Sequence, residues 1–336
     1  MPVRELSHDH QKVMQALRFH EFGKPSEVLK LEPMEWPPLA EGEVDLKLLA
    51  APVNPADLNY IEGTYGIKPE LPAVSGIEGC GEVIASRDPR FEPGDRVIFL
   101  RRAATWASHA RAKGEILFKL PEGIDPLQAA MLKVNPATAW RLLTGFRQPE
   151  PGEWIVQNAA NSGVGRCVIQ LAPLLGVRTI NFVRRPELIP ELGALGADRV
   201  VLDNEDGLQA AKETVGKPGA ALAFNAVGGE SALRLMNLLA PGGIHITFGA
   251  MARRPLTVPN GLLIFKNLQL RGLWITRWIE DASPEEIAEV YQRLARQVMT
   301  GALLQPVDSV FPLDAFQDAL ARVAATDRHG KVLLGG

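Results

Sequence analysis

The sequence predicts an α/β protein of two domains, in which a β-rich domain comes before a doubly wound parallel sheet. A chain of 336 residues exceeds the usual size of one hydrophobic core, so two compact units are expected. Residues 15–119 alternate short apolar runs with turn signals, which is typical of antiparallel strands in a barrel or sandwich. After residue 136, strand-like and helix-like segments alternate, which indicates parallel βαβ units.

The parallel sheet begins with a βαβ unit. We expect a strand at Trp154–Gln157, a helix at Gly165–Leu175 and a second strand at Arg178–Val183. Segments 191–202 and 219–250 continue the alternation, and the strand-like segment 262–275 is expected at the edge of the sheet.

The last apolar run of the chain, "KVLL", is expected to return as a strand to the first domain. The predicted domains are therefore residues 1–132 with 300–336, including a loose leader over 1–13, and residues 133–299.

Composition excludes several classes of function. The formal net charge is only −3, with 46% hydrophobic and 22% charged residues, so no basic field indicates nucleic-acid binding. No stretch reaches the roughly 18 apolar residues that cross a bilayer. Two cysteines cannot form a disulfide framework, and the start of the chain has no signal-peptide run. These features predict a cytoplasmic protein.

The turn "NAANSGVG", residues 158–165, lies between the predicted strand and helix. Backbone N–H groups at such a helix N-terminus favour an anion, and the pyrophosphate of a dinucleotide is the expected ligand. Ala159, Ser162 and Gly165 occupy a G-x-x-G-x-x-G spacing with small residues, and Gly163 stands beside them. The alternative is a tight turn without a ligand.

The end of the next strand indicates which dinucleotide binds. An acidic residue there bonds the ribose hydroxyl of NAD, whereas arginine receives the 2′-phosphate of NADP. This sequence has Arg184 and Arg185 after the strand, which favours NADP(H) over NAD(H). The alternative is a pair of solvated arginines in a loop.

Three segments, "EPGDRVIF", "VNPATAW" and "NAANSGVG", together resemble the medium-chain dehydrogenase/reductase superfamily over nearly the whole chain. The resemblance implies a GroES-like catalytic domain and a Rossmann domain. The zinc alcohol dehydrogenases of that superfamily carry a histidine where this chain has Ile77. An apolar side chain cannot replace an imidazole ligand, so we predict no metal.

A closer resemblance is to the 2-enoyl thioester reductases of the mitochondrial fatty-acid synthesis type. It rests on "APVNPADLNYIEGTYGIKPELPAVSGIEG", "QNAANSGVG", "AFNAVGG" and "LLIFKNLQLRGLWITRW". In that family a tyrosine in the loop matching "GTYGIKPELP" is catalytic, and its position here is Tyr65.

The same resemblance implies the contacts to NADPH. They fall on Asn135, Asn161, Ser162, Gly163, Val164, Arg184, Arg185, Phe248, Gly249, Ala250, Met251, Leu273, Trp274, Ile275 and Lys331. The segment "FGAM" lacks a second glycine that is common in the family, and Pro186 follows the arginine pair.

Reduction of an enoyl thioester needs a group that polarises the carbonyl and supplies a proton, and a neutral phenol can do both. We therefore expect Tyr65 to be the acid, the alternative being a packed loop residue with a solvated hydroxyl. Asn54, Trp106 and Trp278 are candidate substrate contacts. Asn54 is alternatively a turn former before proline, and Trp106 alternatively a core residue.

The expected function is the NADPH-dependent reduction of trans-2-enoyl thioesters of CoA or acyl carrier protein. One alternative is a quinone or alkenal reductase of the same fold, and another is a non-catalytic NADP-binding protein. The apolar edge segment 262–275 also predicts a homodimer, because exposed sheet edges invite pairing and the superfamily uses this edge.

Overall fold

A computed structural model describes residues 14–335 and divides into two compact units. Among the described residues, unit 1 consists of residues 14–122 and 307–335, and unit 2 consists of residues 123–306. The leader predicted over residues 1–13 lies outside the described residues. The sequence-based limits, 1–132 with 300–336 and 133–299, stay a prediction about the functional domains.

Unit 1 contains a three-stranded sheet of order β2-β1-β4 and a seven-stranded sheet. The larger sheet has the order β15-β16-β3-β5-β6-β8, and β7 also pairs with β3. The strands are β1 (Met14–Phe19), β2 (Lys30–Met34), β3 (Glu43–Pro52), β4 (Ala73–Val74), β5 (Cys80–Ser86), β6 (Arg96–Phe99), β7 (His109–Lys113), β8 (Leu117–Lys119), β15 (Val307–Phe311) and β16 (Lys331–Gly335). All pairs among β1 to β8 are antiparallel, which confirms the prediction for residues 15–119.

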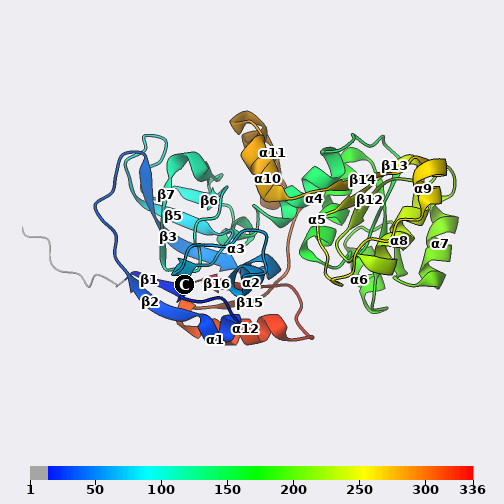
Figure 1. Cartoon of the computed structure of the whole chain (residues 1–336). Coiled ribbons are helices and arrows are strands. Elements are labelled where there is room, and N and C mark those ends of the chain that lie inside the picture. The colour runs from blue at the N-terminus through cyan, green and yellow to red at the C-terminus, as the bar shows by residue number, and fades with distance from the viewer. Residues whose placement is uncertain (1–13, 336) are drawn as a thin grey trace, which may run out of the picture. The chain divides into compact units, whose positions relative to one another are not determined.

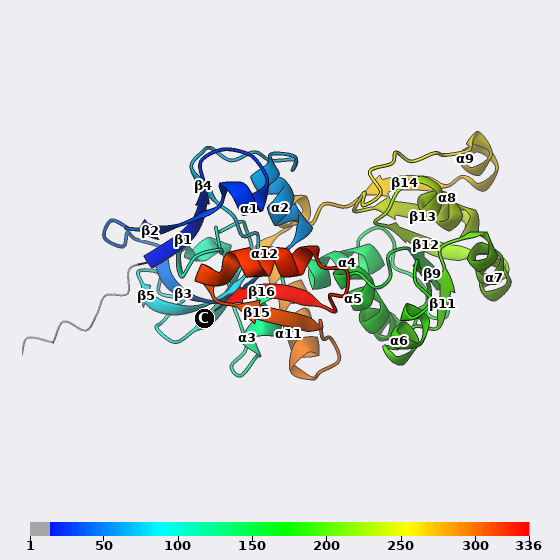
Figure 2. The same ribbon diagram turned by 90° about the horizontal axis from the view of Figure 1, so that it is seen from below.

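The predicted return of the C-terminal run to the first unit is confirmed. Strand β16 pairs antiparallel with β3, with Leu333 opposite Pro52. The helices of unit 1 are α1 (Pro25–Val28), α2 (Pro55–Glu62) and α12 (Phe316–Ala324), with short 3₁₀ turns at Gly114–Ile116 and Leu313–Ala315. Figure 2 shows α12 lying along β16 and β15, where Ala319 is buried in the same core as Val332 and Leu334.

Unit 2 is built on six parallel strands in the order β11-β10-β9-β12-β13-β14. They are β9 (Trp154–Gln157), β10 (Arg178–Val183), β11 (Arg199–Leu202), β12 (Ala220–Asn225), β13 (Leu239–Thr247) and β14 (Gln269–Gly272). Both strands of the predicted βαβ unit are confirmed at their predicted bounds. Counted from β9, the order is that of a doubly wound sheet whose connections reverse direction between β9 and β12.

Helices of unit 2 lie on both faces of this sheet, whereas α10 (Ile275–Asp281) and α11 (Pro284–Met299) stand away from it, as Figure 1 shows. Their bounds are α3 (Pro126–Ala130), α4 (Asn135–Thr144), α5 (Gly163–Leu171), α6 (Leu188–Ala194), α7 (Glu205–Val215), α8 (Gly229–Leu238), α9 (Asn260–Lys266), α10 (Ile275–Asp281) and α11 (Pro284–Met299). One core joins Phe182 and Val156 to α7 and α8, and a second core joins Val183 and Val200 to α5 and α6. No helix within residues 14–335 is long and apolar enough to span a membrane.

Two predicted boundaries in unit 2 are wrong. The predicted helix at Gly165–Leu175 begins earlier, at Gly163, because the Ser162 side chain caps it, and its last turn is a 3₁₀ helix at Ala172–Leu175. Residues 262–275 were expected to be strand-like throughout, but only β14 is a strand. The "LLIFK" part is in α9, which ends where Asn267 adopts the left-handed conformation with φ 50°.

His245 lies in the middle of β13 and is fully buried. Neither ring nitrogen has a hydrogen-bond partner among residues 14–335. Burial without a partner disfavours the charged imidazolium, and it lowers the pKa of His245 from 6.5 to about 4. The folded protein therefore holds this ring neutral at a pH where the unfolded chain would protonate it.

This burial predicts a loss of stability in acid. Between pH 6.5 and about 4 the unfolded state binds a proton at His245 that the folded state does not, so the free energy of unfolding falls as the pH falls. This loss of unfolding free energy is absent above pH 6.5 and reaches about 3 kcal/mol below about pH 4. Urea unfolding of the wild type and of His245→Leu at several pH values measures it. Parallel stability curves for the two proteins would contradict this assignment.

Candidate functional site

Most residues predicted to bind the cofactor follow directly after the carboxyl ends of parallel strands in unit 2. Residues 158–165 follow β9, Arg184 follows β10, Phe248 follows β13 and Leu273 follows β14. Because parallel strands end at the same edge of a sheet, these segments share one edge. The connections reverse direction between β9 and β12, and open α/β sheets bind ligands at the carboxyl ends of the strands beside such a reversal.

The turn after β9 is held by its own backbone and by the cap of α5. Ser162 is the N-cap residue, and its Oγ accepts a hydrogen bond from the N–H of Gly165 at 3.1 Å. A Cβ at Gly165 would lie 2.5 Å from the carbonyl oxygen of Ala160, so only glycine fits there. The first N–H groups of α5 have no partner within the helix by geometry and face outward. The turn can therefore hold an anion at the helix N-terminus.

Arg166 fixes the outer part of this turn. Its Nε donates to the carbonyl oxygen of Asn161 at 3.2 Å, and its Nη2 pairs with the carboxylate of Glu191 on α6. The position of Asn161, a predicted cofactor residue, thus depends on a helix on the same side of the sheet.

Buried amides at the ends of β9 and β12 were missed by sequence reasoning. The Asn158 Nδ2 donates to Asn225 Oδ1 at 2.8 Å, and Asn158 Oδ1 accepts from the N–H of Ala226 at 2.8 Å. Gln157 Nε2 donates to the carbonyl oxygen of Gly165 at 3.0 Å. These bonds hold the two strand ends and the start of α5 together. The available signal was a polar residue directly after each of two apolar strands.

Asn135 reaches the turn from a different element. It is the first residue of α4, it is 6% exposed, and its amide lies against Gly163 at the start of α5. A Cβ on Gly163 would lie 2.3 Å from Asn135 Nδ2, so a larger residue at position 163 would displace the end of the Asn135 side chain.

The arginine pair lies exposed after β10, at the carboxyl edge. Arg185 forms an ion pair of 3.5 Å with Glu187, whereas Arg184 makes no ion pair with another residue in 14–335. An exposed guanidinium at this position can receive a phosphate bidentately.

The remaining predicted contacts of unit 2 also lie on edge loops. The N–H of Phe248 donates to the carbonyl oxygen of Asn225 at 3.0 Å, and that of Leu273 donates to Thr247 at 3.0 Å. Gly249 and Ala250 lead to Met251, whose side chain is 66% exposed. Trp274 caps the N-terminus of α10, which begins at Ile275.

Tyr65 lies in unit 1, directly after α2. Gly63 ends that helix in the left-handed conformation with φ 74°, and the N–H of Tyr65 then donates to the carbonyl oxygen of Asn59 at 3.1 Å. The Tyr65 ring is half-buried against the core of unit 1. The guanidinium carbon of Arg102 lies 5.7 Å from the centre of this ring and 3.8 Å from that of Tyr60.

A buried charged network supports α2 and the Tyr65 loop. Asp57 is fully buried, and its carboxylate accepts from the N–H groups of Asn54 at 3.1 Å and Ile77 at 2.8 Å. Burial raises the pKa of Asp57, while Arg102, at 3.7 Å, acts in the opposite direction.

The two predicted contacts Asn54 and Lys331 belong to the same network. Lys331 Nζ donates to Asn54 Oδ1, and Asn54 Nδ2 donates to the buried carboxylate of Glu78 at 2.8 Å. The structure thus brings together Asn54, Lys331 and two acidic residues that sequence reasoning did not select.

The two tryptophans proposed for substrate lie in different units. Trp106 is 1% exposed in the core of unit 1, and its Nε1 donates to the carbonyl oxygen of Pro52 at 3.3 Å. Trp278, in unit 2, donates to Glu286 at 3.1 Å and stacks with Arg141 at 5.0 Å. Their roles in substrate binding stay predictions.

Ile77 occupies the position that a histidine ligand would need, and its side chain is buried. In the part of the chain that the structure describes, no group of three or more His, Cys, Asp or Glu side chains could hold a metal ion. The prediction that the protein works without a metal therefore rests on the sequence.

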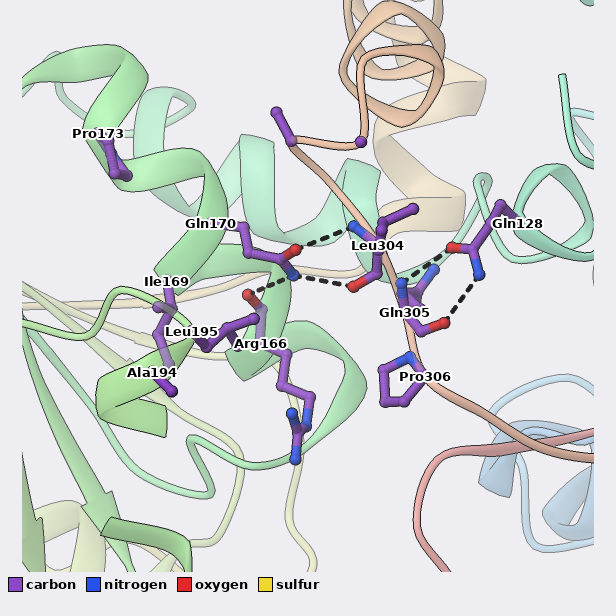
Figure 3. Close-up of a pocket in the computed structure, with 12 residues that line it drawn as sticks. Gln128, Arg166, Ile169, Gln170, Pro173, Ala194, Leu195, Leu304, Gln305 and Pro306 are labelled. Carbon is purple, nitrogen blue, oxygen red and sulfur yellow. Dashed lines mark hydrogen bonds between the residues drawn. The ribbon is translucent and has the colours of Figure 1, made fainter. Parts of the chain in front are cut away.

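A separate cavity of about 600 Å³ lies in unit 2 between α5, α6 and the segment 301–306 (Figure 3). Arg166, Gln170, Leu195, Gln128 and Gln305 are among the residues that line it. None of the predicted cofactor or substrate residues lines it. It is therefore distinct from the strand-end site, which is the group of predicted cofactor residues that follow the parallel strands of unit 2.

The chain matches two sequence families in succession. The alcohol dehydrogenase GroES-like domain matches residues 40–121, and the zinc-binding dehydrogenase family matches residues 163–296. These matches and the parallel sheet of unit 2 confirm the predicted fold class, a GroES-like domain combined with a Rossmann domain.

Similar proteins extend over nearly the whole chain. The mitochondrial enoyl-acyl-carrier-protein reductase of Rattus norvegicus is 42% identical over 315 residues, covering 91% of this chain and 84% of that protein. The Etr1p complex with NADP and crotonyl-CoA has a TM-score of 0.88 at 30% identity, covering 96% of this chain and 100% of that chain. A putative NADPH:quinone reductase from Bacillus thuringiensis has the same TM-score at 28% identity, covering 96% and 99%.

One sequence-based prediction is contradicted by these relatives. The chain was expected to be cytoplasmic, but the rat, mouse, human and Arabidopsis thaliana relatives are all mitochondrial enzymes. That prediction rested on the few cysteines and on the lack of an apolar signal run, and these features do not single out the cytoplasm.

Proposed function

Because the chain belongs to the family of the enoyl-acyl-carrier-protein reductases, we propose that it reduces the C2–C3 double bond of trans-2-enoyl thioesters. The observation that carries the proposal is 42% identity to such a reductase over nine tenths of the chain. The cofactor is NADPH, as the Etr1p complex with NADP and crotonyl-CoA supports. The thiol carrier is CoA or acyl carrier protein.

The chemistry has two steps. NADPH, when bound, supplies a hydride to C3, and the electron pair of the double bond moves through C2 onto the thioester oxygen. The protein must stabilise this enolate and then deliver a proton to C2. One hydride and one proton are added in total, and the saturated thioester leaves.

The strand-end site of unit 2 has the groups that the dinucleotide requires. The N-terminus of α5, with Asn161 to Val164, would receive the pyrophosphate. Arg184 and Arg185 would receive the 2′-phosphate, because both are exposed at the end of β10. Phe248 to Met251 and Leu273 to Ile275, on neighbouring edge loops, would line the remainder of the cofactor.

Tyr65 is the proposed acid. A phenol donates a hydrogen bond to a developing oxyanion and can release its proton directly or through water. Its backbone is held by Asn59 and its ring by the core of unit 1, so the hydroxyl is presented by a supported loop.

A comparison of substrates tests the reaction. We expect NADPH oxidation, followed by its absorbance, to be faster with crotonyl-CoA than with a quinone or an alkenal. The quinone alternative is kept because a putative quinone reductase has an equally similar fold at 28% identity. Faster turnover of the quinone would overturn the proposal, and cofactor binding without any oxidation would favour a non-catalytic NADP-binding protein.

Substitution of the proposed acid tests the mechanism. Tyr65→Phe removes only the hydroxyl, so we expect turnover of crotonyl-CoA to fall at least about tenfold while NADPH affinity is kept. Tyr60→Phe is the matched control, because Tyr60 stacks on the same Arg102 but is 7% exposed. If Tyr65→Phe keeps full turnover, Tyr65 has no part in the proton transfer.

We further propose a homodimer formed through the β14 edge. Strand β14 is terminal in the sheet, and all four of its residues are exposed. The preceding α9 exposes Ile264 by 70% and Phe265 by 84%. A terminal strand beside an exposed apolar helix face favours pairing with a second copy.

Light scattering after gel filtration tests this assembly. We expect a mass of twice the 36.6 kDa chain for the wild type, and a shift toward the monomer for Phe265→Glu, which places a charge in the apolar face. Leu174→Glu is the control, because Leu174 is also exposed on unit 2 but lies outside α9 and β14. A wild-type monomer at micromolar concentration would contradict the proposal.

A further inference from the structure

Buried hydrogen bonds link Gln305, near the end of unit 2, to Asn135, the first residue of α4. Gln305 Nε2 donates to the carbonyl oxygen of Met131 at 3.0 Å, and Asn135 Nδ2 donates to Gln305 Oε1 at 2.7 Å. The two side chains are 4% and 6% exposed. Gln305 carries none of the predicted site roles, and it contacts a residue that does.

The direction of both bonds follows from the Met131 carbonyl. A backbone carbonyl can only accept, so the Gln305 amide must turn its nitrogen toward Met131 and its oxygen toward Asn135. Asn135 must then donate through Nδ2, and its Oδ1 is turned away from Gln305. Reversal of either amide would place two donors or two acceptors face to face. Gln305 therefore fixes the orientation of the Asn135 amide, with Nδ2 toward Gln305 and Oδ1 on the opposite side.

The end of the Asn135 amide that points away from Gln305 is the oxygen Oδ1, a hydrogen-bond acceptor near the turn of residues 158–165. Asn135 Oδ1 accepts no hydrogen bond from any residue in 14–335, although the residue is 6% exposed. A Cβ on Gly163 would lie 3.4 Å from this oxygen, which places it against the first residue of α5. This oxygen is not among the fully buried side-chain atoms that lack a partner, so solvent reaches it, and a ligand or a water molecule can donate a hydrogen bond to it.

We infer that Gln305 is a positioning residue for the cofactor: it holds the Asn135 amide so that Oδ1 accepts a hydrogen bond from an N–H or O–H group of bound NADPH. This inference rests on the proposed function, because the donor belongs to the dinucleotide. It assigns Gln305 a part in cofactor affinity without direct contact to the cofactor.

Anchoring of the chain and orientation of Asn135 can be separated experimentally. The backbone of Gln305 is held by a different side chain: Gln128 Nε2 donates to its carbonyl oxygen, and Gln128 Oε1 accepts from its N–H, both at 2.9 Å. Gln170 holds Leu304 in the same manner, and Figure 3 shows both pairs beside the cavity. Gln128→Met thus weakens the anchoring and leaves the side-chain bonds to Met131 and Asn135 in place.

The test measures the Kd of NADPH by fluorescence titration, without any enoyl substrate. Gln305→Met removes the donor to Met131 and the acceptor for Asn135, and we expect Kd to rise about five- to tenfold, the effect of one misdirected hydrogen bond. Gln128→Met should change Kd less than about twofold. In an Asn135→Ala background, Gln305→Met should have no further effect on Kd, because the oxygen that it orients is gone.

Gln305→Lys provides a second test, in which the added charge and the loss of the acceptor have opposite effects on the affinity for NADPH. An ammonium group can donate both to Met131 and to Asn135 Oδ1, which reverses the Asn135 amide, and thermal unfolding measured beside the Kd shows whether the variant tolerates this buried charge. The added positive charge by itself would tighten binding of an anionic cofactor. We expect weaker binding, because the acceptor is no longer presented. Tighter binding would overturn the inference.

The remaining outcomes are equally decisive. An unchanged Kd for folded Gln305→Met, an equal rise for Gln128→Met, or a further rise in the Asn135→Ala background would each overturn the inference and leave the proposed function standing. A wild type that does not bind NADPH would instead overturn the proposed function. With the 3-acetylpyridine analogue of NADPH, loss of the Gln305→Met effect assigns the donor to the carboxamide, and its persistence assigns it to a ribose hydroxyl or the adenine amino group.

Discussion

The structure of unit 2 depends on the pairing of polar groups at the point where the parallel sheet reverses direction. Asn158 and Asn225 end neighbouring strands, and their buried amides bond to each other and to the backbone of Ala226. Without these bonds, buried donors and acceptors would remain unpaired at a considerable cost in stability. The neighbouring Gln157, at the end of β9, donates to the carbonyl oxygen of Gly165 in α5, so buried amides at these strand ends support both the sheet and the start of the helix.

In unit 1, a network of buried charged groups supports the loop that carries Tyr65. Asp57 and Glu78 are both fully buried, and Arg102 and Lys331 supply positive charge to the network around them. A buried carboxylate is tolerated only where hydrogen bonds and counter-charges replace water. Here those groups lie on α2 and on the segments packed against it. The loop that carries Tyr65 begins at the end of this helix and is hydrogen-bonded to it through Asn59.

Much of this arrangement could be predicted from local pattern. The strands at Trp154–Gln157 and Arg178–Val183 follow from apolar runs between turn signals, and the anion site follows from small residues between strand and helix. The α9 segment was misassigned because a short apolar run is compatible with either helix or strand, and local sequence does not decide between them. Gln305 gave no signal, since its partners Met131 and Asn135 lie about 170 positions earlier in the chain.

The sequence by itself determined the fold class, the family and the order of the elements, because these depend on periodicity and on short motifs. It also determined that Ile77 cannot be a metal ligand, which is a property of the side chain alone. Only the tertiary structure decided that Asn135 lies against Gly163, which way the Asn135 amide is turned and which charges surround Asp57. Those features depend on distances between residues that are remote in the chain, and no local pattern encodes such distances.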